Sequence, residues 1–330
     1  MKIAFFEIEP EEKNYIKNKF KGYKVYFTDK ELNEKNARKF SDYDIVSIFI
    51  DSEINSKIIN KFKKLKAITT RSTGYDHIDL VECKKRKIKV FNVPRYGQNT
   101  VAEQTFALIL TLSRKIFESI NRTKKGNFSI DDLEGFDLKG KTLGIVGMGG
   151  IGTYVAQIAK GFEMKIISST HHPKKEVAKK FGVKFVSFNN LLKNSDIITL
   201  HVPLTKKTHH LINKDNIRII KKGAYLINTS RGDIVDTTAL IIGLDKGILS
   251  GAGLDVLEEE DKLKEHTASK KYRKGVKKIM HENHALLKRK NVVITPHNAF
   301  NTKEALNRIL DTTVENINSV IKNKSKNLVK

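Results

Sequence analysis

Short runs of β-branched and aromatic residues alternate with polar stretches from Lys2 to Pro94. Such runs are typical of a parallel sheet, because crossover helices cover both of its faces and leave the strands almost wholly apolar. The runs that predict strands are KIAFFEI, KVYFT, DIVSIFI, KAITT and KVFNV. This part of the chain is therefore expected to form an α/β domain.

The same alternation returns in the second part of the chain. Each apolar run there is followed by a turn or helix signal, and the runs are LGIVG, MKIIS, DIITLHV, AYLINTS, GAGLDV and NVVIT. Six such strands predict a second, doubly wound parallel sheet.

Two long helices are expected beside these sheets. Thr100 to Glu103 has the spacing of a capping box and begins the apolar segment FALILTLSRKIF, which suits a helix buried between domains. A helical stripe of apolar residues after Thr302 should return to the first domain. The sequence thus predicts a first domain of residues 1–99 plus 299–330 and a second of residues 100–298. The stripe comprises Leu306, Ile309, Leu310, Ile317, Val320 and Ile321.

The composition agrees with two folded domains. The chain has 330 residues, more than one hydrophobic core usually supports. Its 39% hydrophobic and 30% charged residues are wrong for a disordered chain. An acidic N-terminal region and the lack of a long apolar run favour a cytoplasmic protein. The single cysteine, Cys83, is interpreted as a small packing residue on a helix.

The net charge of +25 would attract polyanions, so nucleic-acid binding is a second hypothesis. The excess is mostly lysine on predicted helix faces, without interleaved aromatic residues for base stacking, so we expect no specific nucleic-acid partner and no membrane partner. Residues 261–290 contain eleven basic and three acidic residues. We expect an exposed helix there, and the sequence does not indicate its role.

One glycine-rich motif points to a cofactor. A buried strand, Leu143 to Val146, runs into G-x-G-x-x-G and then into a helical segment. In that setting the first glycine makes the turn, the second admits a pyrophosphate, and the third allows close helix packing, with the anion at the helix N-terminus. The motif is Gly147-Met148-Gly149-Gly150-Ile151-Gly152.

The sequence leaves the choice between NAD and NADP open. A NAD site usually carries Asp or Glu at the end of the second strand to bind the ribose hydroxyls. Here that strand ends in STHHPKK around Thr170, without an acid. The absence of a repulsive carboxylate, with His, Lys and Thr nearby, favours NADP. Alternatively, the cluster belongs to the lysine-rich surface and selectivity is relaxed.

Three strand ends carry residues suited to carbonyl reduction: Arg231, Glu260 and His297. All should face the crevice at the carboxyl ends of the second sheet. Each taken alone has an ordinary explanation, as a surface ion pair, a solvated glutamate or a structural histidine.

Together with other motifs, these residues carry a family resemblance that spans nearly the whole chain. The motifs are TRSTGYDHID, NVPRYGQNTVAEQTFALIL, LGIVGMGGIG, LHVPLTKKTHHLIN, INTSRGDIVD, GLDVLEEE and TPHNAF. The chain resembles the D-isomer-specific 2-hydroxyacid dehydrogenases, and Tyr96 and Phe300 make it most similar to the D-lactate dehydrogenase branch. The resemblance implies a flavodoxin-like substrate domain, a Rossmann NAD(P)-binding domain and an active-site cleft between them.

The resemblance also implies roles for the three strand-end residues. His297 would be the general acid that protonates the substrate carbonyl as hydride arrives. Glu260 would bind the other ring nitrogen and favour the imidazolium. Arg231 would hold the substrate carboxylate with its fixed fork of donors. Glu260 is chosen because the family's glutamate lies five residues after the strand aspartate, here Asp255; Glu258 and Glu259 are then expected to face solvent.

By the same resemblance, the backbone N–H groups of Thr73 and Gly74 would receive the substrate carboxylate, while Tyr96 and Phe300 would line its side-chain pocket. The implied cofactor contacts are Val202, Pro203, Thr208, Thr229, Ser230 and Asp255. Asp255 could alternatively be an ordinary strand-end cap.

Two departures from the family pattern concern the cofactor. Many relatives have Arg where this chain has Gly150, and the acid expected at Thr170 is missing. The missing acid favours NADP, whereas the family resemblance itself favours NAD. Hydride chemistry is untouched by either departure, so the chain is expected to reduce a small 2-oxo acid, most simply pyruvate, to its D-2-hydroxy acid.

Several alternatives remain open. One is a related reductase of glyoxylate, hydroxypyruvate or a branched 2-oxo acid, and another is a cofactor-sensing protein without turnover. The resemblance implies a homodimer. No metal site is expected, because His171, His172, His209 and His210 lack carboxylate or Cys partners at ligand spacing and are interpreted as paired, exposed histidines.

Overall fold

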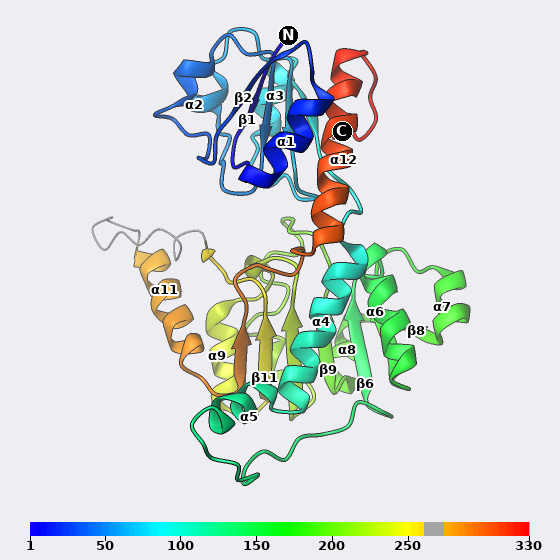
Figure 1. Ribbon diagram of the computed structural model, residues 1–330. Coiled ribbons are helices and arrows are strands. Elements are labelled where there is room, and N and C mark those ends of the chain that lie inside the picture. The colour runs from blue at the N-terminus through cyan, green and yellow to red at the C-terminus, as the bar shows by residue number, and fades with distance from the viewer. Residues whose placement is uncertain (261–273, 330) are drawn as a thin grey trace. The chain divides into compact units, whose positions relative to one another are not determined.

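The computed structural model describes residues 1–260 and 274–329. The chain divides into two compact units, Met1–Tyr96 with Asn301–Lys330 and Gly97–Phe300. The sequence places the same transitions at 99/100 and 298/299. Each unit is built around one parallel sheet (Figure 1).

The first unit has five parallel strands in the order β2-β1-β3-β4-β5, which is the flavodoxin-like order. Alternate residues of the strands point to opposite faces and feed two separate cores. One core packs against helices α1 and α12, and the other against η1, α2 and α3. The strands are β1 Lys2–Phe5, β2 Lys24–Phe27, β3 Ile45–Ile48, β4 Ala67–Thr70 and β5 Lys89–Phe91. The helices are α1 Pro10–Lys19, η1 Ala37–Phe40, α2 Ser56–Ile59, α3 Leu80–Lys85 and α12 Lys303–Ile321.

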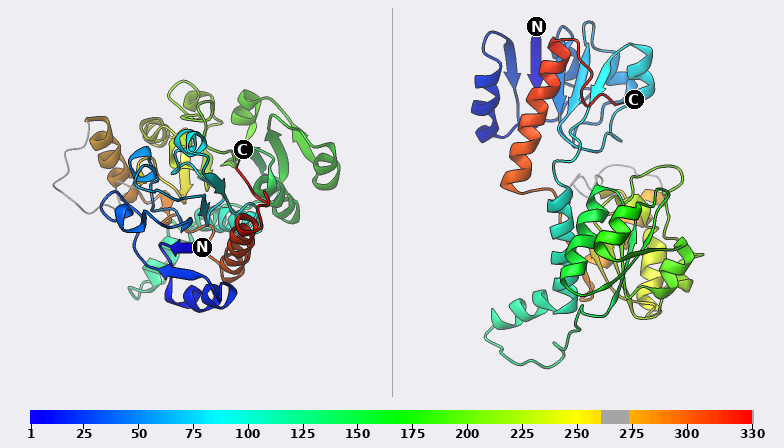
Figure 2. Two further views of the ribbon diagram at one scale, coloured as in Figure 1. Left: turned by 90° about the horizontal axis from the view of Figure 1, so that it is seen from above. Right: turned by 90° about the vertical axis from the view of Figure 1, so that its right-hand side faces the viewer.

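Helix α12 belongs to this unit although it lies at the far end of the sequence. It begins at the N-cap Thr302, whose side chain accepts a hydrogen bond from the Ala305 amide. Its apolar stripe, including Leu310 and Ile317, packs on Ile3 and Phe5 of β1. Figure 2 shows it lying along the first sheet.

In its described residues, the second unit has seven parallel strands in the order β12-β11-β10-β9-β6-β7-β8. Its first strand, β6, lies inside the sheet, and the chain winds outward from it in both directions, as in a Rossmann fold. The crevice at the switch between β6 and β9 is where such sheets bind nucleotides. The strands are β6 Thr142–Val146, β7 Lys165–Ser169, β8 Val183–Phe185, β9 Ile197–Leu200, β10 Ala224–Asn228, β11 Leu249–Leu254 and β12 Val292–Ile294.

Helices cover both faces of the second sheet. Helices α4, α6 and α7 pack into one core, and α8, α9 and α11 pack into the other. Helices α4 and α6 lie side by side (Figures 1 and 2). The α-helices are α4 Gln98–Ser113, α5 Ile116–Thr123, α6 Gly150–Gly161, α7 Lys175–Phe181, α8 Phe188–Asn194, α9 Thr237–Asp245 and α11 Lys274–Leu287. The short 3₁₀ turns are η2 Ile217–Ile219 and η3 Gly232–Ile234.

Two sequence-based predictions about these elements are wrong, and a third falls partly outside the described residues. The prediction of six strands is wrong, because β8 adds a seventh at the sheet edge, where it pairs only with β7. The capping box at Thr100 is also wrong: α4 begins at Gln98 after the N-cap Gly97, and Thr100 is a buried residue inside it. The helix expected over residues 261–290 is found only as α11, since residues 261–273 lie outside the described part of the chain.

Cys83 is buried in α3, as expected for a packing residue. Burial raises the pKa of its thiol to about 11. No helix of the described chain is long and apolar enough to cross a membrane.

Candidate active site

Three loops meet at the carboxyl edge of the second sheet. Strands β10, β11 and β12 are parallel neighbours, so their ends lie at the same edge. Arg231, Glu260 and His297 lie on the loops that follow these three strands. The topology therefore gathers the residues that the sequence singles out.

The Glu260 carboxylate and the His297 imidazole form a close pair. Glu260 Oε1 lies 2.5 Å from His297 Nδ1, and both side chains are 22% exposed. Glu260 Oε2 accepts a hydrogen bond from the Leu257 amide at 3.2 Å, which fixes the carboxylate from its other side. With Nδ1 engaged, Nε2 is the nitrogen left to face a reacting group.

The backbone at His297 is strained. Its φ is +52°, a left-handed conformation that is uncommon for a residue with a side chain. Asp255 holds the turn: its backbone oxygen accepts the His297 amide at 2.8 Å, and its carboxylate accepts the amides of Asn298 at 2.9 Å and Ala299 at 2.8 Å. The turn thus aims the imidazole through a conformation that it would not adopt alone.

The same Asp255 side chain is 1% exposed and also accepts a hydrogen bond from Thr295 Oγ1. Burial raises the pKa of this carboxyl, although the three donors oppose the effect. The Asp255 carboxylate therefore caps the end of β11, which was one of the two interpretations of this residue. A contact between Asp255 and a nicotinamide stays a prediction.

A buried asparagine shapes the loop of Arg231. Asn228 ends β10, and its amide donates to the Arg231 carbonyl at 2.8 Å while its oxygen accepts from the Ser230 amide at 3.1 Å. The next residue, Gly232, lies against the Leu257–Glu258 peptide so closely that a Cβ would be 2.0 Å from the Leu257 carbonyl carbon. The Arg231 loop therefore packs directly on the segment that carries Glu260.

Two sequence-based expectations in this region are wrong. Glu258 does not face solvent: it is 6% exposed, because Thr237 and His210 enclose its carboxylate. His209 is exposed as expected, but His210 is half-buried, and its Nε2 lies 2.8 Å from Glu258 Oε1. The sequence run EEE does not distinguish the buried Glu258 from its two partly exposed neighbours.

The glycine-rich loop has the shape that a dinucleotide requires. Gly147 has a φ of +94°, and a Cβ there would lie 2.4 Å from the His201 carbonyl oxygen. A Cβ on Gly152 would lie 2.2 Å from the Gly147 oxygen, so α6 packs on the loop at a distance only glycine permits. A Cβ on Gly149, the N-cap of α6, would meet nothing within 4 Å. This open space at a helix N-terminus fits a pyrophosphate.

Gly150 also has a partner that the sequence does not reveal. A Cβ on Gly150 would lie 2.1 Å from Gln98 Nε2, so the Gln98 carboxamide occupies the space that a side chain at position 150 would need. Gln98 starts α4, which runs beside α6. The only sequence signal for this contact was the small residue at position 150. Ile151 follows within the first turn of α6.

The other predicted cofactor residues lie on the loops after neighbouring strands. Val202 and Pro203 follow β9, and Thr208 donates its hydroxyl proton to the Pro203 carbonyl at 2.6 Å. Thr229 and Ser230 follow β10. Thr170 follows β7, and its hydroxyl accepts the His172 amide at 3.3 Å, so no carboxylate stands at that position.

The predicted substrate residues fall into both units. Thr73 and Gly74 follow β4 in the first unit, and no hydrogen bond among the described residues uses either backbone N–H. Tyr96 ends that part of the unit, and its carbonyl accepts from Arg308 Nε at 2.6 Å. Phe300 ends the second unit. In the described chain, no group of three His, Cys, Asp or Glu residues is arranged to hold a metal ion.

Comparison with known proteins agrees with this architecture. Residues 106–299 match the model of the D-isomer specific 2-hydroxyacid dehydrogenase family, NAD binding domain. The D-lactate dehydrogenase of Escherichia coli is 33% identical over 98% of this chain and 97% of its own length. A glyoxylate reductase of Thermococcus litoralis is 41% identical over 77% of this chain and 73% of its own. The crystal structure of a D-lactate dehydrogenase from Aquifex aeolicus, complexed with NAD and lactic acid, is 36% identical, with a TM-score of 0.91 over 99% of this chain and 98% of that one.

Proposed function

Since the chain belongs to the D-isomer-specific 2-hydroxyacid dehydrogenases, a family of oxidoreductases, we propose that it reduces pyruvate to D-lactate with a reduced nicotinamide cofactor. The contact between Glu260 and His297 carries this proposal, because it supplies a positioned proton donor beside a dinucleotide fold. The similarity to D-lactate dehydrogenases along nearly the whole chain supports the choice of substrate.

In the proposed reaction, each of the three strand-end side chains has its own role. A reduced nicotinamide cofactor held at the glycine loop, Gly147 to Gly152, would supply the hydride. His297 donates the proton from Nε2 to the carbonyl oxygen, while Glu260 at Nδ1 stabilises the imidazolium before the transfer and orients the ring. Arg231 binds the substrate carboxylate and polarises the carbonyl.

The proposed substrate contacts also include the backbone N–H groups of Thr73 and Gly74, which would receive the carboxylate. Tyr96 and Phe300 would border the substrate side chain, and two aromatic rings favour a small group such as the methyl of pyruvate. A glyoxylate reductase among the relatives makes glyoxylate the main competing substrate.

Steady-state reduction of pyruvate, glyoxylate, hydroxypyruvate and 2-oxoisocaproate, each with NADH and with NADPH, tests this proposal. Pyruvate should give the highest kcat/KM. A higher value with another acid would reassign the substrate within the family. Tight cofactor binding without turnover of any acid would contradict the proposal and favour a cofactor-sensing protein.

We further propose that the site accepts NADPH at least as well as NADH. The position after β7 that selects for NAD in such folds is Thr170, which cannot repel a 2′-phosphate. Lys174 and Lys175 lie within the next five residues and add positive charge.

Thr170→Asp should therefore lower kcat/KM for NADPH by about tenfold or more, because like-charge contact costs over a kcal/mol. The value for NADH should change much less. Thr170→Asn is the matched control, because asparagine has the shape of aspartate without its charge. Its kcat/KM values should resemble those of the wild type. Equal losses with both cofactors in the Asp variant would show that Thr170 does not face the 2′ position.

We also propose a homodimer. Helix α5 has no buried residue, and its apolar side chains Ile116, Phe117 and Ile120 are exposed. Phe128 and Ile130 follow in the next segment and are 80% and 82% exposed. Apolar residues gathered in this way are typical of a surface that another subunit covers.

A further inference from the structure

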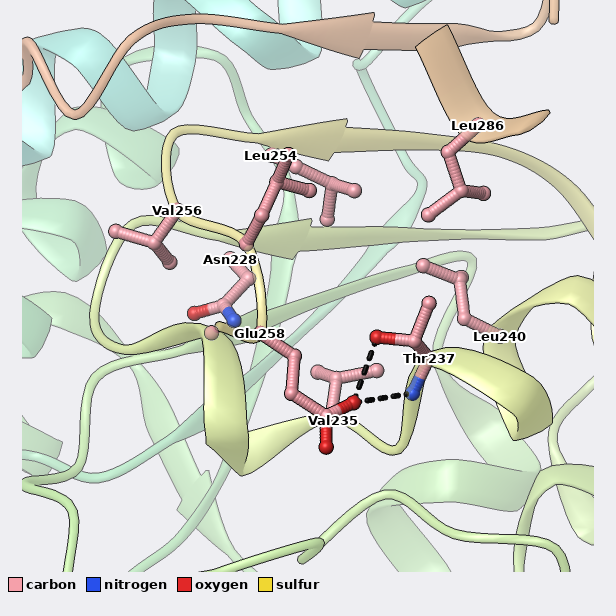
Figure 3. Close-up of a pocket in the computed structure, with 10 residues that line it drawn as sticks. Asn228, Val235, Thr237, Leu240, Leu254, Val256, Glu258 and Leu286 are labelled. Atoms are coloured by element: carbon pink, nitrogen blue, oxygen red, sulfur yellow. Dashed lines mark hydrogen bonds between the residues drawn. The ribbon is translucent and has the colours of Figure 1, made fainter. Parts of the chain in front are cut away.

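Glu258 makes an unusually complete set of hydrogen bonds for a residue with no part in the proposed chemistry. Its Oε2 accepts from the Thr237 amide at 3.0 Å and from the Thr237 hydroxyl at 2.7 Å. Its Oε1 lies 2.8 Å from His210 Nε2. Figure 3 shows the carboxylate pointing to Thr237 at the start of α9.

The backbone of Glu258 is held as firmly as its side chain. Its carbonyl accepts a hydrogen bond from the side-chain Nδ2 of Asn283 in α11 at 2.8 Å, and Asn283 is wholly buried. On the other side, the Leu257–Glu258 peptide packs against Gly232 of the Arg231 loop. Four segments of the chain therefore contact Glu258, through Thr237, His210, Asn283 and Gly232.

A short turn connects the fixed residue Glu258 to Glu260. Glu259 has a φ of +55°, so the chain reverses between Glu258 and Glu260. The Glu260 carboxylate then folds back to accept the Leu257 amide while its other oxygen meets His297. The position of Glu260 depends on where residues 257 and 258 are fixed.

From these contacts we infer that Glu258 is a positioning residue, which sets Glu260 against His297 and holds both in register with the Arg231 loop. This inference rests on the proposed function, because it assigns a purpose to the placement of those three side chains.

A buried carboxylate needs such a purpose, since an apolar residue of similar size usually gives equal or greater stability at a buried ionic site. The surrounding charges are mixed. Asp233 lies nearby, and burial followed by Glu258 raises its pKa, while His209 and His210 oppose the shift. His210 also donates its backbone N–H to the Asp233 carbonyl, which joins this cluster to the loop after β10.

Glu258→Leu tests the inference, because it removes every side-chain bond at nearly constant volume. We expect kcat with pyruvate to fall on the order of 10-fold to 100-fold, as for a misplacement of about 1 Å. The NADH dissociation constant should stay within about twofold, because the glycine loop lies on other strands.

Glu258→Gln is the rescue variant, because a carboxamide oxygen still accepts both Thr237 bonds; it should recover most of kcat. Glu282→Leu is the matched control: the Glu282 carboxylate also accepts a hydrogen bond from a threonine hydroxyl at the start of α9, that of Thr238, and among the described residues it makes no hydrogen bond to residues 257–260. If the Leu variant does not fold, Thr237→Val removes one bond and should show a smaller loss of the same kind.

Unchanged kcat in folded Glu258→Leu would overturn the inference, as would an equal loss in the Glu282 control. A downfield proton resonance from the His297 Nδ1–H, present in the wild type and lost in Glu258→Leu, tests the positioning without turnover. If no 2-oxo acid is reduced by the wild type, the proposed function fails, and this resonance still decides whether Glu258 places Glu260.

Discussion

At the scale of single residues, the site depends on side chains that hold other side chains. His297 reaches its left-handed conformation because Asp255 accepts three backbone N–H groups of its turn. Asn228 holds the loop of Arg231, because its side-chain N–H donates to the Arg231 carbonyl and its side-chain oxygen accepts the Ser230 backbone N–H. A buried polar side chain without hydrogen-bond partners lowers the stability of the fold. The hydrogen bonds of Asp255 and Asn228 offset that cost, so both polar residues can be buried.

His201 should make stability sensitive to acid. Burial lowers the pKa of its imidazole to about 3, and its Nδ1 has no hydrogen-bond partner among the described residues. The unfolded chain takes up a proton near the ordinary pKa of about 6.5, whereas the folded chain does not, so stability is lost as pH falls below that value.

Between pH 7 and pH 5 this one residue should cost about 2 kcal/mol of unfolding free energy. Urea titrations at both pH values measure the loss. His201→Gln cannot be protonated, so its loss should be smaller than that of the wild type by this amount. Equal losses in the two proteins would contradict the assignment.

The sequence could predict the pairing of Glu260 with His297 by resemblance, and the structure has that contact. It could not predict the burial of Glu258 in the same acidic run. Solvent exposure at consecutive positions of a loop depends on which segments cross it, and Thr237, His210 and Asn283 are far from Glu258 in sequence. The sequence could not predict the contact between Gln98 and Gly150 either, because these two residues are also far apart in the chain.

At the scale of elements, apolar runs identified the strands because buried parallel strands have almost no polar positions. The exception is β8, which has three residues, contains Lys184 and pairs only with β7. An edge strand of that length leaves little hydrophobic pattern. The start of α4 was misplaced because Thr100 faces the core, where its hydroxyl is not used as a cap.

The glycine loop gives a prediction that separates fold from cofactor binding. Gly149→Ala places a methyl in open space, so stability should change by less than about 1 kcal/mol. NADH affinity should nevertheless fall, because the methyl takes the space of the pyrophosphate.

Gly152→Ala instead drives a methyl into the Gly147 carbonyl and should destabilise the unit by about 1–3 kcal/mol. Thermal unfolding and fluorescence titration with NADH measure the two effects. If Gly149→Ala bound NADH as the wild type does, the pyrophosphate would have to lie elsewhere.

At the scale of the whole molecule, the chain combines two parallel sheets with different strand orders. The alternation of strands and helices was enough to predict both sheets. The strand orders themselves follow from packing across the sequence, which no local pattern contains, and so the resemblance to a family had to supply them.

The proposed dimer is tested by Phe117→Glu combined with Ile120→Glu. Both side chains are exposed on α5, so the substitutions should leave the fold intact and place charges in an apolar contact. Sedimentation velocity should show a dimer for the wild type and a monomer for the variant. A dimer that persists in the variant would place the interface elsewhere.

The central claim is that this chain is a reductase in which His297 donates the proton. The most direct test is the loss of NADH or NADPH absorbance with pyruvate, measured for the wild type and for His297→Ala side by side. The wild type should turn over, and the variant should lose about 100-fold or more of kcat while it binds cofactor normally. Wild-type turnover in His297→Ala, or none in the wild type with either cofactor, would contradict the account.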